Sequence, residues 1–422
     1  MHVLITNVYS YQNKGDAAIV IALLQEVRRA FPQATIHIQT TDIQHDKRKY
    51  GAPVSPTLLW TLLSAVRGRP FHMRLWRLVS GWLRLQLYLT CMRLMRRAPR
   101  WLLPATLQSF VDDIQAADLV IACGGGYLRT ASKSLTDVLL LKITCLNFLA
   151  AKRLGKPVYL YSQSIGPVHG RWQRAILRRT LNQVDIIEPR EDVSQAYLAA
   201  LDVQNMVTPT ADPVFLLGGQ GSFPFELVQP HPRRLHVGIT VRRWFQTASE
   251  LNAYIHAVAQ TIDHLIKRHD AEVWYVPQVI AGSFGDDDRL IARQVRQAVT
   301  RKDRFTVIEA DLHPFQMIGL CGHMDAFIGT RMHSNIFALI NEVPVVAIEY
   351  EHKTKGIMRG LGLEQLTIPI HEVTAASLIE HVELLLARRT YFQRLIHKHL
   401  PAQISQSRKA IEVIKTAYET LA

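Results

Sequence analysis

The sequence of 422 residues is poor in cysteine. Its four cysteines stand far apart, at Cys91, Cys123, Cys145 and Cys321. Because no pair has the spacing of metal ligands, neither a zinc site nor a disulfide framework is indicated, and a reducing compartment fits best. The first ten residues, MHVLITNVYS, also lack the basic segment and the cleavage site of a secretory signal peptide. We therefore expect a cytoplasmic protein.

Acidic residues are absent from positions 47–111. Within this interval, positions 67–100 carry nine arginines, interleaved with tryptophan, leucine and tyrosine. They are Arg67, Arg69, Arg74, Arg77, Arg84, Arg93, Arg96, Arg97 and Arg100. Uncharged runs here fall just short of the roughly 18 residues that a membrane-spanning helix needs. This composition is typical of a helix that lies in a membrane interface.

The formal net charge of +14 indicates a polyanion, a membrane surface or an anionic substrate as partner. No nucleic-acid-binding motif accompanies the charge, so we expect no nucleic acid partner. We expect residues 57–101 to make peripheral contact with an anionic membrane, on the inner face of the cytoplasmic membrane. Because the arginines do not form one face of a helical wheel, a basic helical hairpin that covers a domain edge is the alternative.

Apolar strands alternate with amphipathic helices along the rest of the chain. Before the Gly- and Pro-rich stretch 218–234, strands are expected at 2–6, 34–39, 118–122, 157–161 and 185–188. After it, they are expected at 235–241, 272–277, 305–308, 326–328 and 344–348. This alternation predicts an α/β protein with two Rossmann-like, doubly wound domains that face a cleft.

The predicted boundaries follow from this alternation. The first domain covers residues 1–220 and contains the basic helical insert at about 53–105; the second covers 235–396, and residues 397–422 form a final helix. We expect a helix break at Pro401. Doubly wound domains bind ligands beyond the carboxyl ends of their strands, so polar clusters at those ends are the candidate sites.

Two glycine-containing turns follow strands of the first domain. Asn13-Lys14-Gly15-Asp16 opens a helix whose free N–H groups suit an anion or a sugar hydroxyl, although Asp16 is equally well explained as a helix cap. The run from Gly124 to Gly126 lets the backbone approach a ligand closely, but it matches no dinucleotide or P-loop pattern.

Charged residues follow several other strands. Arg190 either clamps an anion or pairs with the neighbouring acids, and Arg242 ends the first strand of the second domain. The acidic run 286–288 precedes a helix, where capping is a more common role than binding a divalent metal. We therefore expect no metal.

The segment from Asp325 to Lys355 carries the strongest signal. A strand, a short turn, a helix and a second strand place Arg331 and His333 at a helix N-terminus that favours anions. Histidine titrates near neutral pH, so His333 can donate a proton while Arg331 holds the charge of a substrate. The pattern predicts an anionic-substrate site.

Together these motifs resemble the polysaccharide pyruvyl transferase family, in collinear order over roughly residues 3–363. The matching segments are NKGD at 13–16, GGG at 124–126, SIGP at 164–167, REDVS at 190–194, ADP at 211–213, GITVR at 238–242, GTRMHS at 329–334 and EYEHK at 349–353. The basic insert lies outside them. The chain is most similar to bacterial exopolysaccharide members of the colanic-acid type.

The resemblance implies two Rossmann-like domains arranged as in GT-B glycosyltransferases, with the C-terminal helix crossing back to the N-terminal domain. It implies transfer of the enolpyruvyl group of phosphoenolpyruvate onto a sugar diol of an exopolysaccharide precursor, which gives a pyruvate ketal and phosphate. Phosphoenolpyruvate is then a co-substrate, and no cofactor is needed. The acceptor is a saccharide, and the basic insert favours a lipid-linked one.

The resemblance also implies residue roles. We expect His333 to protonate the enol carbon as a sugar hydroxyl attacks. The donor is expected on Arg331, Arg242, Arg190, Lys353 and Ser334. The acceptor is expected across the cleft, on Asn13, Gly15, Asp16, Gly124, Gly125, Gly126 and Asp212.

A GT-B glycosyltransferase that uses a nucleotide sugar is the nearest alternative. Many enzymes that resemble one place a ribose-binding glutamate seven residues before the Pro-Val-Val strand, where this chain has Phe337. A non-catalytic saccharide-binding protein is the third interpretation, and it does not require the Arg331–His333 pair.

Overall fold

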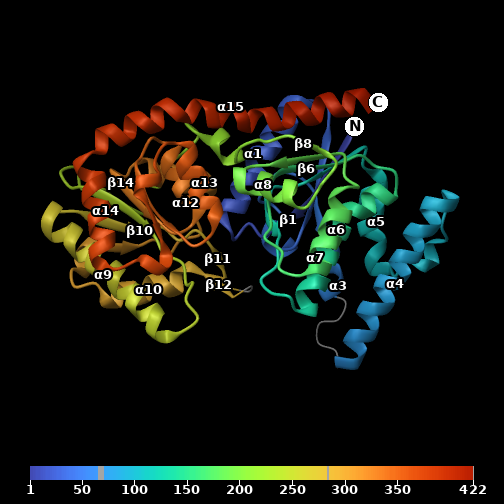
Figure 1. Cartoon of the computed structure of the whole chain (residues 1–422), viewed down its shortest axis with the longest axis horizontal. Coiled ribbons are helices and arrows are strands. Elements are labelled where there is room, and N and C mark those ends of the chain that lie inside the picture. The colour runs from blue at the N-terminus through green and yellow to red at the C-terminus, as the bar shows by residue number, and fades with distance from the viewer. Residues whose placement is uncertain (65–70, 283–284, 422) are drawn as a thin grey trace. The chain divides into compact units, whose positions relative to one another are not determined.

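The computed structural model describes residues 1–64, 71–282 and 285–421, so Arg67 and Arg69 of the basic insert lie outside the described residues, as does the side chain of Arg74. The chain forms two compact units, each built around a parallel sheet (Figure 1). Unit 1 comprises Met1–Tyr11, Ile19–Asp212 and Gln406–Ala422, and unit 2 comprises Gln12–Ala18 and Pro213–Ser405.

Unit 1 contains an eight-stranded sheet in the order β3-β2-β1-β4-β6-β7-β8, with β5 paired to β6. The strands are β1 His2–Val8, β2 Thr35–Thr40, β3 Val54–Pro56, β4 Leu119–Ala122, β5 Gly125–Leu128, β6 Val158–Ile165, β7 Ile186–Pro189 and β8 Met206–Val207. All of these pairs are parallel. Every residue of β4 and β6 is buried, as expected of central strands in a parallel sheet.

One large apolar cluster joins most of the helices of unit 1, but not the first two, to this sheet. The helices are α1 Lys14–Ala30, α2 Ile43–Asp46, α3 Leu58–Ser64, α4 Phe71–Met95, α5 Ala105–Ala116, α6 Leu135–Arg153, α7 Arg171–Leu181 and α8 Asp192–Ala200. Phe110 of α5 and Phe148 of α6 are fully buried in the cluster. The described part of the basic insert contains α3 and α4, and Leu85 and Leu89 of α4 reach the same core.

Unit 2 contains a six-stranded parallel sheet in the order β13-β10-β9-β14-β15-β16. The strands are β9 His236–Thr240, β10 Glu272–Tyr275, β13 Phe305–Val307, β14 Ala326–Gly329, β15 Val345–Glu349 and β16 Thr367–Pro369. A separate antiparallel pair joins β11 Ile280–Ala281 to β12 Asp286–Asp287. Counted along the chain, the large sheet has the Rossmann order 3-2-1-4-5-6, which reverses between β9 and β14. The prediction of two Rossmann-like, doubly wound units is confirmed.

The helices of unit 2 are α9 Ala248–His269, α10 Asp288–Ala298, α11 Pro314–Gly322, α12 Met332–Leu339, α13 His352–Gly360 and α14 Ala375–Ala387. Among the described residues, no helix is both long enough and apolar enough to cross a membrane.

The last helix, α15, extends from Arg389 to Leu421 (Figure 1). From Gln406 onward it belongs to unit 1, where Glu412 forms an ion pair with Arg29 at 2.6 Å. The predicted return of the C-terminal helix to the N-terminal domain is confirmed.

The predicted helix break at Pro401 is wrong, because α15 continues through this residue. A proline removes one backbone donor from a helix. In a helix of 33 residues that packs on either side of the proline, this loss is not enough to end the helix. The chain instead breaks at Arg388, between α14 and α15.

Candidate active site

The carboxyl ends of β9, β14 and β15 lie next to one another in unit 2. The strand order reverses between the first two, which is where doubly wound sheets bind ligands. Arg242 follows β9, Arg331 and His333 follow β14, and Lys353 lies in the first turn of α13 after β15. Four predicted site residues are thus gathered at one edge of one sheet.

Arg331 is the N-cap residue of α12, and 6% of its surface is exposed. Its Nη2 donates to Oδ1 of Asp288 and to Oδ1 of Asp286, both at 2.6 Å. Burial alone lowers the pKa of an arginine, but the adjacent Asp288 carboxylate raises the pKa of Arg331 well above its usual value. The guanidinium therefore stays charged, and carboxylates already occupy its donors.

The acidic run 286–288 binds this arginine and caps helix α10. Oδ2 of Asp288 also accepts the backbone N–H of Val279 at 3.0 Å. Asp287 is the N-cap residue of α10 and accepts the backbone N–H of Arg289 at 3.0 Å. Because each carboxylate has a cation or an N–H partner, the structure favours the capping interpretation over a divalent-metal site.

His333 lies in the first turn of α12 and packs against the turn that opens α1. A Cβ atom on Gly15 would lie 2.1 Å from Nδ1 of His333, so only glycine permits this approach. The backbone N–H of Lys14 donates to the carbonyl of Gln278 at 3.0 Å, which fastens the turn to unit 2. We expected this turn to lie on the same side of the site as the triple glycine. The structure instead assigns it to unit 2, together with His333.

Asn13 caps the first helix. Its Oδ1 accepts the backbone N–H of Gly15 at 3.2 Å and of Asp16 at 3.4 Å. Its Nδ2 donates to Oδ2 of Asp16 at 2.7 Å. The cap is thus Asn13, and Asp16 supports it from the first turn.

Lys14 is a buried cation that the candidate residues did not include. Its side chain is 1% exposed, and its Nζ forms an ion pair with the carboxylate of Asp311. It immediately precedes Gly15, the residue that contacts His333. The signal in the sequence was a lysine beside a glycine at a helix start, an arrangement suited to a phosphate.

An aromatic ring lies close to Arg242 at this edge. Cζ of Arg242 is 4.7 Å from the ring centroid of Tyr350. Tyr350 also interacts electrostatically with Arg331. The sequence offered Tyr350 only as part of a matching segment, because an aromatic residue after a strand has no specific meaning by itself. Lys353 forms an ion pair with Glu351 at 2.8 Å.

Ser334 is buried and bonds within unit 2. Its Oγ donates to the carbonyl of Arg331 at 2.7 Å and lies 2.8 Å from Oγ1 of Thr240. These bonds tie α12 to the end of β9. The hydroxyl thus positions the residues of the site.

Unit 1 holds the remaining predicted residues. Arg190 follows β7, donates to Oδ2 of Asp212 at 2.8 Å and to Oγ of Ser164 at 2.8 Å, and lies 3.5 Å from Glu191. Of the two interpretations open for Arg190, the structure favours pairing with acids.

The triple glycine follows β4, at the point where the strand order of unit 1 reverses between β1 and β4. A Cβ atom on Gly124 would lie 2.7 Å from the carbonyl oxygen of Ser162 and 2.9 Å from that of Tyr161. Gly124 is therefore required for backbone packing against β6. Gly125 and Gly126 begin β5.

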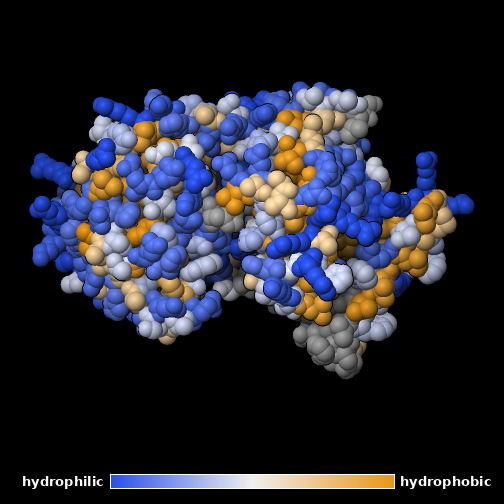
Figure 2. Space-filling model, in the orientation of Figure 1, coloured by the Kyte–Doolittle hydropathy of each residue, from blue (hydrophilic) through white to orange (hydrophobic). Residues whose placement is uncertain are grey.

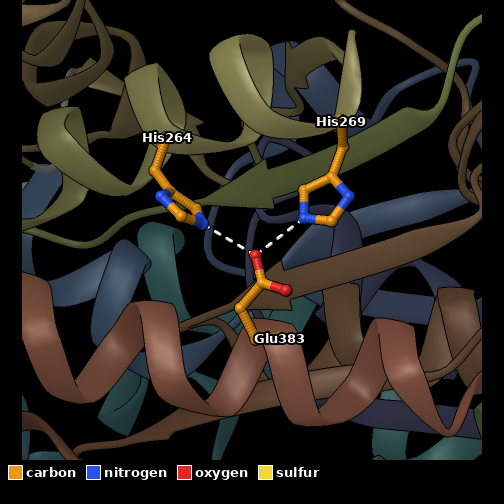
Figure 3. Close-up of side chains that lie close together, drawn as sticks. All are labelled: His264, His269 and Glu383. Atoms are coloured by element: carbon orange, nitrogen blue, oxygen red, sulfur yellow. Dashed lines mark hydrogen bonds and ion pairs between the residues drawn. The ribbon is translucent and has the colours of Figure 1, made fainter.

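A cluster with metal-binding side chains lies elsewhere in unit 2. His264 and His269 come from α9, and Glu383 comes from α14 (Figure 3). Oε1 of Glu383 is 2.7 Å from Nε2 of each histidine. Because α9 leads from the end of β9 back to the start of β10, its last turn lies at the opposite edge of the sheet from Arg331. The cluster is therefore separate from the candidate site.

The fold resembles those of solved nucleotide-sugar enzymes. A structure of UDP-GlcNAc 2-epimerase from Neisseria meningitidis, bound to UDP-GlcNAc, matches with a TM-score of 0.59 and 14% identity, over 99% of this chain and 100% of that one. A UGT transferase from Siraitia grosvenorii, in complex with UDP, matches with a TM-score of 0.55 and 10% identity, over 99% and 100% of the two chains. The chain thus has the GT-B fold, as predicted.

The sequence is more specific than the fold. The family model for polysaccharide pyruvyl transferase matches residues 13–352, and the chain belongs to this family. It is 26% identical over 330 residues to the amylovoran biosynthesis protein AmsJ of Erwinia amylovora, which covers 72% of this chain and 76% of that protein. The predicted family is confirmed, and the chain is a transferase of polysaccharide biosynthesis.

Proposed function

We propose that this chain transfers the enolpyruvyl group of phosphoenolpyruvate onto two hydroxyls of a sugar in an exopolysaccharide precursor. The products are a pyruvate ketal of the sugar and inorganic phosphate. The observation that carries the proposal is the Arg331–His333 pair at the point in unit 2 where the strand order reverses, in a chain of this family.

The chemistry balances in two steps. One sugar hydroxyl adds to C2 of the enolpyruvyl group while His333, as imidazolium, delivers a proton to C3. A second hydroxyl then attacks C2, and the bond from C2 to the phosphate oxygen breaks, with the electron pair leaving on phosphate. One hydroxyl proton is taken up by the acceptor base and passed on to His333, and the other leaves with the phosphate, so both groups are ready for the next cycle.

The donor carries a carboxylate and a phosphate and therefore needs cations. Asp286, one partner of Arg331, has 41% of its side chain exposed, so a donor anion can replace it on Nη2 while the buried Asp288 stays. Arg242, Lys353 and Lys14 add positive charge. Arg190 and Ser334, whose bonds are internal, act as positioning residues rather than as direct contacts.

The predicted acceptor residues belong to two groups, one in each unit. In unit 2, Gly15 packs against His333. The next residue, Asp16, which accepts a hydrogen bond from Asn13, is our candidate base for the attacking hydroxyl. In unit 1 the proposed residues are Gly124, Gly125, Gly126 and Asp212. Asp212 suits the role of base less well, because Arg190 already occupies its carboxylate.

A direct assay tests the reaction. Purified full-length protein is incubated with phosphoenolpyruvate and a panel of nitrophenyl or lipid-linked hexoses, and phosphate release and product mass are measured. A ketal formed in equal amount to the phosphate is expected. If no hexose acceptor gives a ketal while a nucleotide sugar is turned over, the proposal is wrong.

The nucleotide-sugar glycosyltransferase remains the alternative because it shares the fold. Phe337, which takes the place of the ribose-binding glutamate, is fully buried in α12. This position offers no carboxylate to a ribose, which supports the pyruvyl transferase proposal over the alternative.

Contact with the membrane is part of the proposal. It places the protein in the cytoplasm, peripherally on the inner face of the cytoplasmic membrane, with residues 57–101 at the surface and a lipid-linked saccharide as acceptor. The absence of acidic residues from positions 47–111 supports this placement.

A further inference from the structure

Helix α4 presents an apolar stripe to solvent. The stripe consists of Met73, Trp76, Val79, Leu83, Leu87 and Leu94, and between 38% and 76% of each residue is exposed. These positions recur every three or four residues, with one interval of seven, so they share one side of the helix. Figure 2 shows hydrophobic residues gathered over α4. Contiguous exposed apolar surface of this kind marks an interaction surface.

The opposite side of α4 is committed to unit 1. Leu85, Tyr88 and Leu89 are buried in its core. Arg84 donates from Nε to the carbonyl of Leu102 at 2.9 Å and from Nη2 to the carbonyl of Trp101, which is itself 72% exposed. Because α4 is already anchored on its buried side, the stripe is left for a partner outside this chain.

Arginines border the stripe. At about 100° per residue, Arg77 and Arg84 lie on one side of it and Arg93 lies on the other. Arg77 and Arg93 are exposed, and no acidic residue occurs at positions 47–111. In the sequence, the arginines did not form one face of a helical wheel, which counted against a membrane-interface helix. In the structure they flank an apolar face, so they do not need to form a face of their own.

We propose that this stripe binds an anionic bilayer, with α4 lying parallel to the membrane surface. The apolar side chains insert among the acyl chains, and the flanking arginines pair with the anionic headgroups. Trp76 and Trp101 suit the level of the headgroups. A protein partner would need an apolar groove with acidic borders along about 30 Å of helix. An anionic bilayer has an apolar interior and a negatively charged surface at every point.

The membrane contact does not depend on the reaction; only its use, to reach a lipid-linked acceptor, rests on the proposed function. The test is sedimentation of full-length protein with vesicles of phosphatidylcholine alone, or with about a third phosphatidylserine. The stripe variant is Trp76→Gln with Leu83→Gln and Leu87→Gln. Its matched control changes three similarly exposed residues elsewhere, Trp172→Gln with Met206→Gln and Leu290→Gln.

We expect the wild type and the control to bind phosphatidylserine vesicles at least about tenfold better than neutral ones, and binding to weaken as salt rises. The stripe variant should lose at least about tenfold in binding. Its turnover of a soluble nitrophenyl acceptor should equal that of the control, which separates this proposal from the reaction. The proposal is overturned if the wild type does not bind, if it binds both vesicles equally, or if the stripe variant binds like the wild type. A stripe variant that only breaks a dimer in solution would also overturn it.

Discussion

Among the described residues, each unit buries one arginine between a strand and a helix, and the two arginines are held differently. Arg190 lies between β7 and α8, and both of its carboxylate partners, Asp212 and Glu191, are at most 4% exposed. Arg331 lies between β14 and α12, and only one of its partners, Asp288, is buried to this degree. The other, Asp286, is 41% exposed.

The difference shows which arginine can exchange partners. Releasing Arg190 would leave buried carboxylates without their cation, which costs several kcal/mol. At Arg331 the exposed carboxylate of Asp286 can turn to water when an anionic ligand arrives, at little cost. Two residues after each arginine the chain carries Asp192 in unit 1 but His333 in unit 2. We therefore propose that unit 2 combines an exchangeable cation, Arg331, with a proton donor, His333.

The largest effect is expected at this histidine. His333→Ala should lower turnover by about 10²–10⁴-fold, because it removes the proposed general acid, while leaving the protein folded. The measurement is the initial rate of phosphate release with saturating donor. His264→Ala, in the same unit at the opposite edge of the sheet, is the control and should keep its activity. Equal activity of both variants would remove His333 from the role of acid.

Arg190→Ala should destabilise the protein by about 3–5 kcal/mol, because it leaves two buried carboxylates without a cation. Urea denaturation measures this change. Arg178→Ala is the control, since Arg178 pairs with Asp202 on the surface, where both side chains are at least half exposed. The control should cost no more than about 1 kcal/mol. If Arg190→Ala costs as little as the control, Arg190 is not held more firmly by its buried carboxylates than Arg331 is by its partners, and the contrast between the two arginines is wrong.

The sequence was sufficient for the architecture because strand and helix periods are local. It placed Arg331 and His333 at a strand end and a helix start, which depends only on residues nearby. The carboxylate partners of the two arginines could not be predicted from the sequence, because they lie far away along the chain. Asp288 precedes Arg331 by 43 residues, and Asp212 follows Arg190 by 22. The burial of Lys14 and its contact with Asp311 depend on how the first turn packs in unit 2, which no local pattern encodes.

Buried acids extend the comparison of the two units. Asp288 lies against Arg331, whereas Asp46 of unit 1 is buried against the Thr40 hydroxyl and the backbone N–H of Tyr11. Burial raises the pKa of the Asp46 carboxyl from 3.8 to about 6. Between these two pH values the unfolded chain loses this proton and the folded chain keeps it, so stability falls as pH rises. Two pKa units correspond to roughly 3 kcal/mol.

Asp46→Asn removes this titration. The unfolding free energy of the variant, minus that of the wild type, should therefore rise by up to about 3 kcal/mol between roughly pH 4 and pH 7. Urea denaturation at a series of pH values measures the difference. Asp112→Asn, which changes an exposed carboxylate paired with Arg100, should show no such rise. A flat difference for Asp46→Asn would mean that burial does not raise the pKa of this carboxyl in the folded protein.

The smallest effect tests partner exchange at Arg331. Asp286→Asn should change stability by less than about 1 kcal/mol, because the carboxylate is partly exposed. It should also lower KM for the donor several-fold at nearly unchanged kcat, since the anion no longer competes with a carboxylate for Nη2. Asp288→Asn, by contrast, changes a buried partner and should destabilise the protein markedly. If Asp286→Asn instead raises KM, Asp286 orients Arg331 for the donor, and the exchange of partners does not occur.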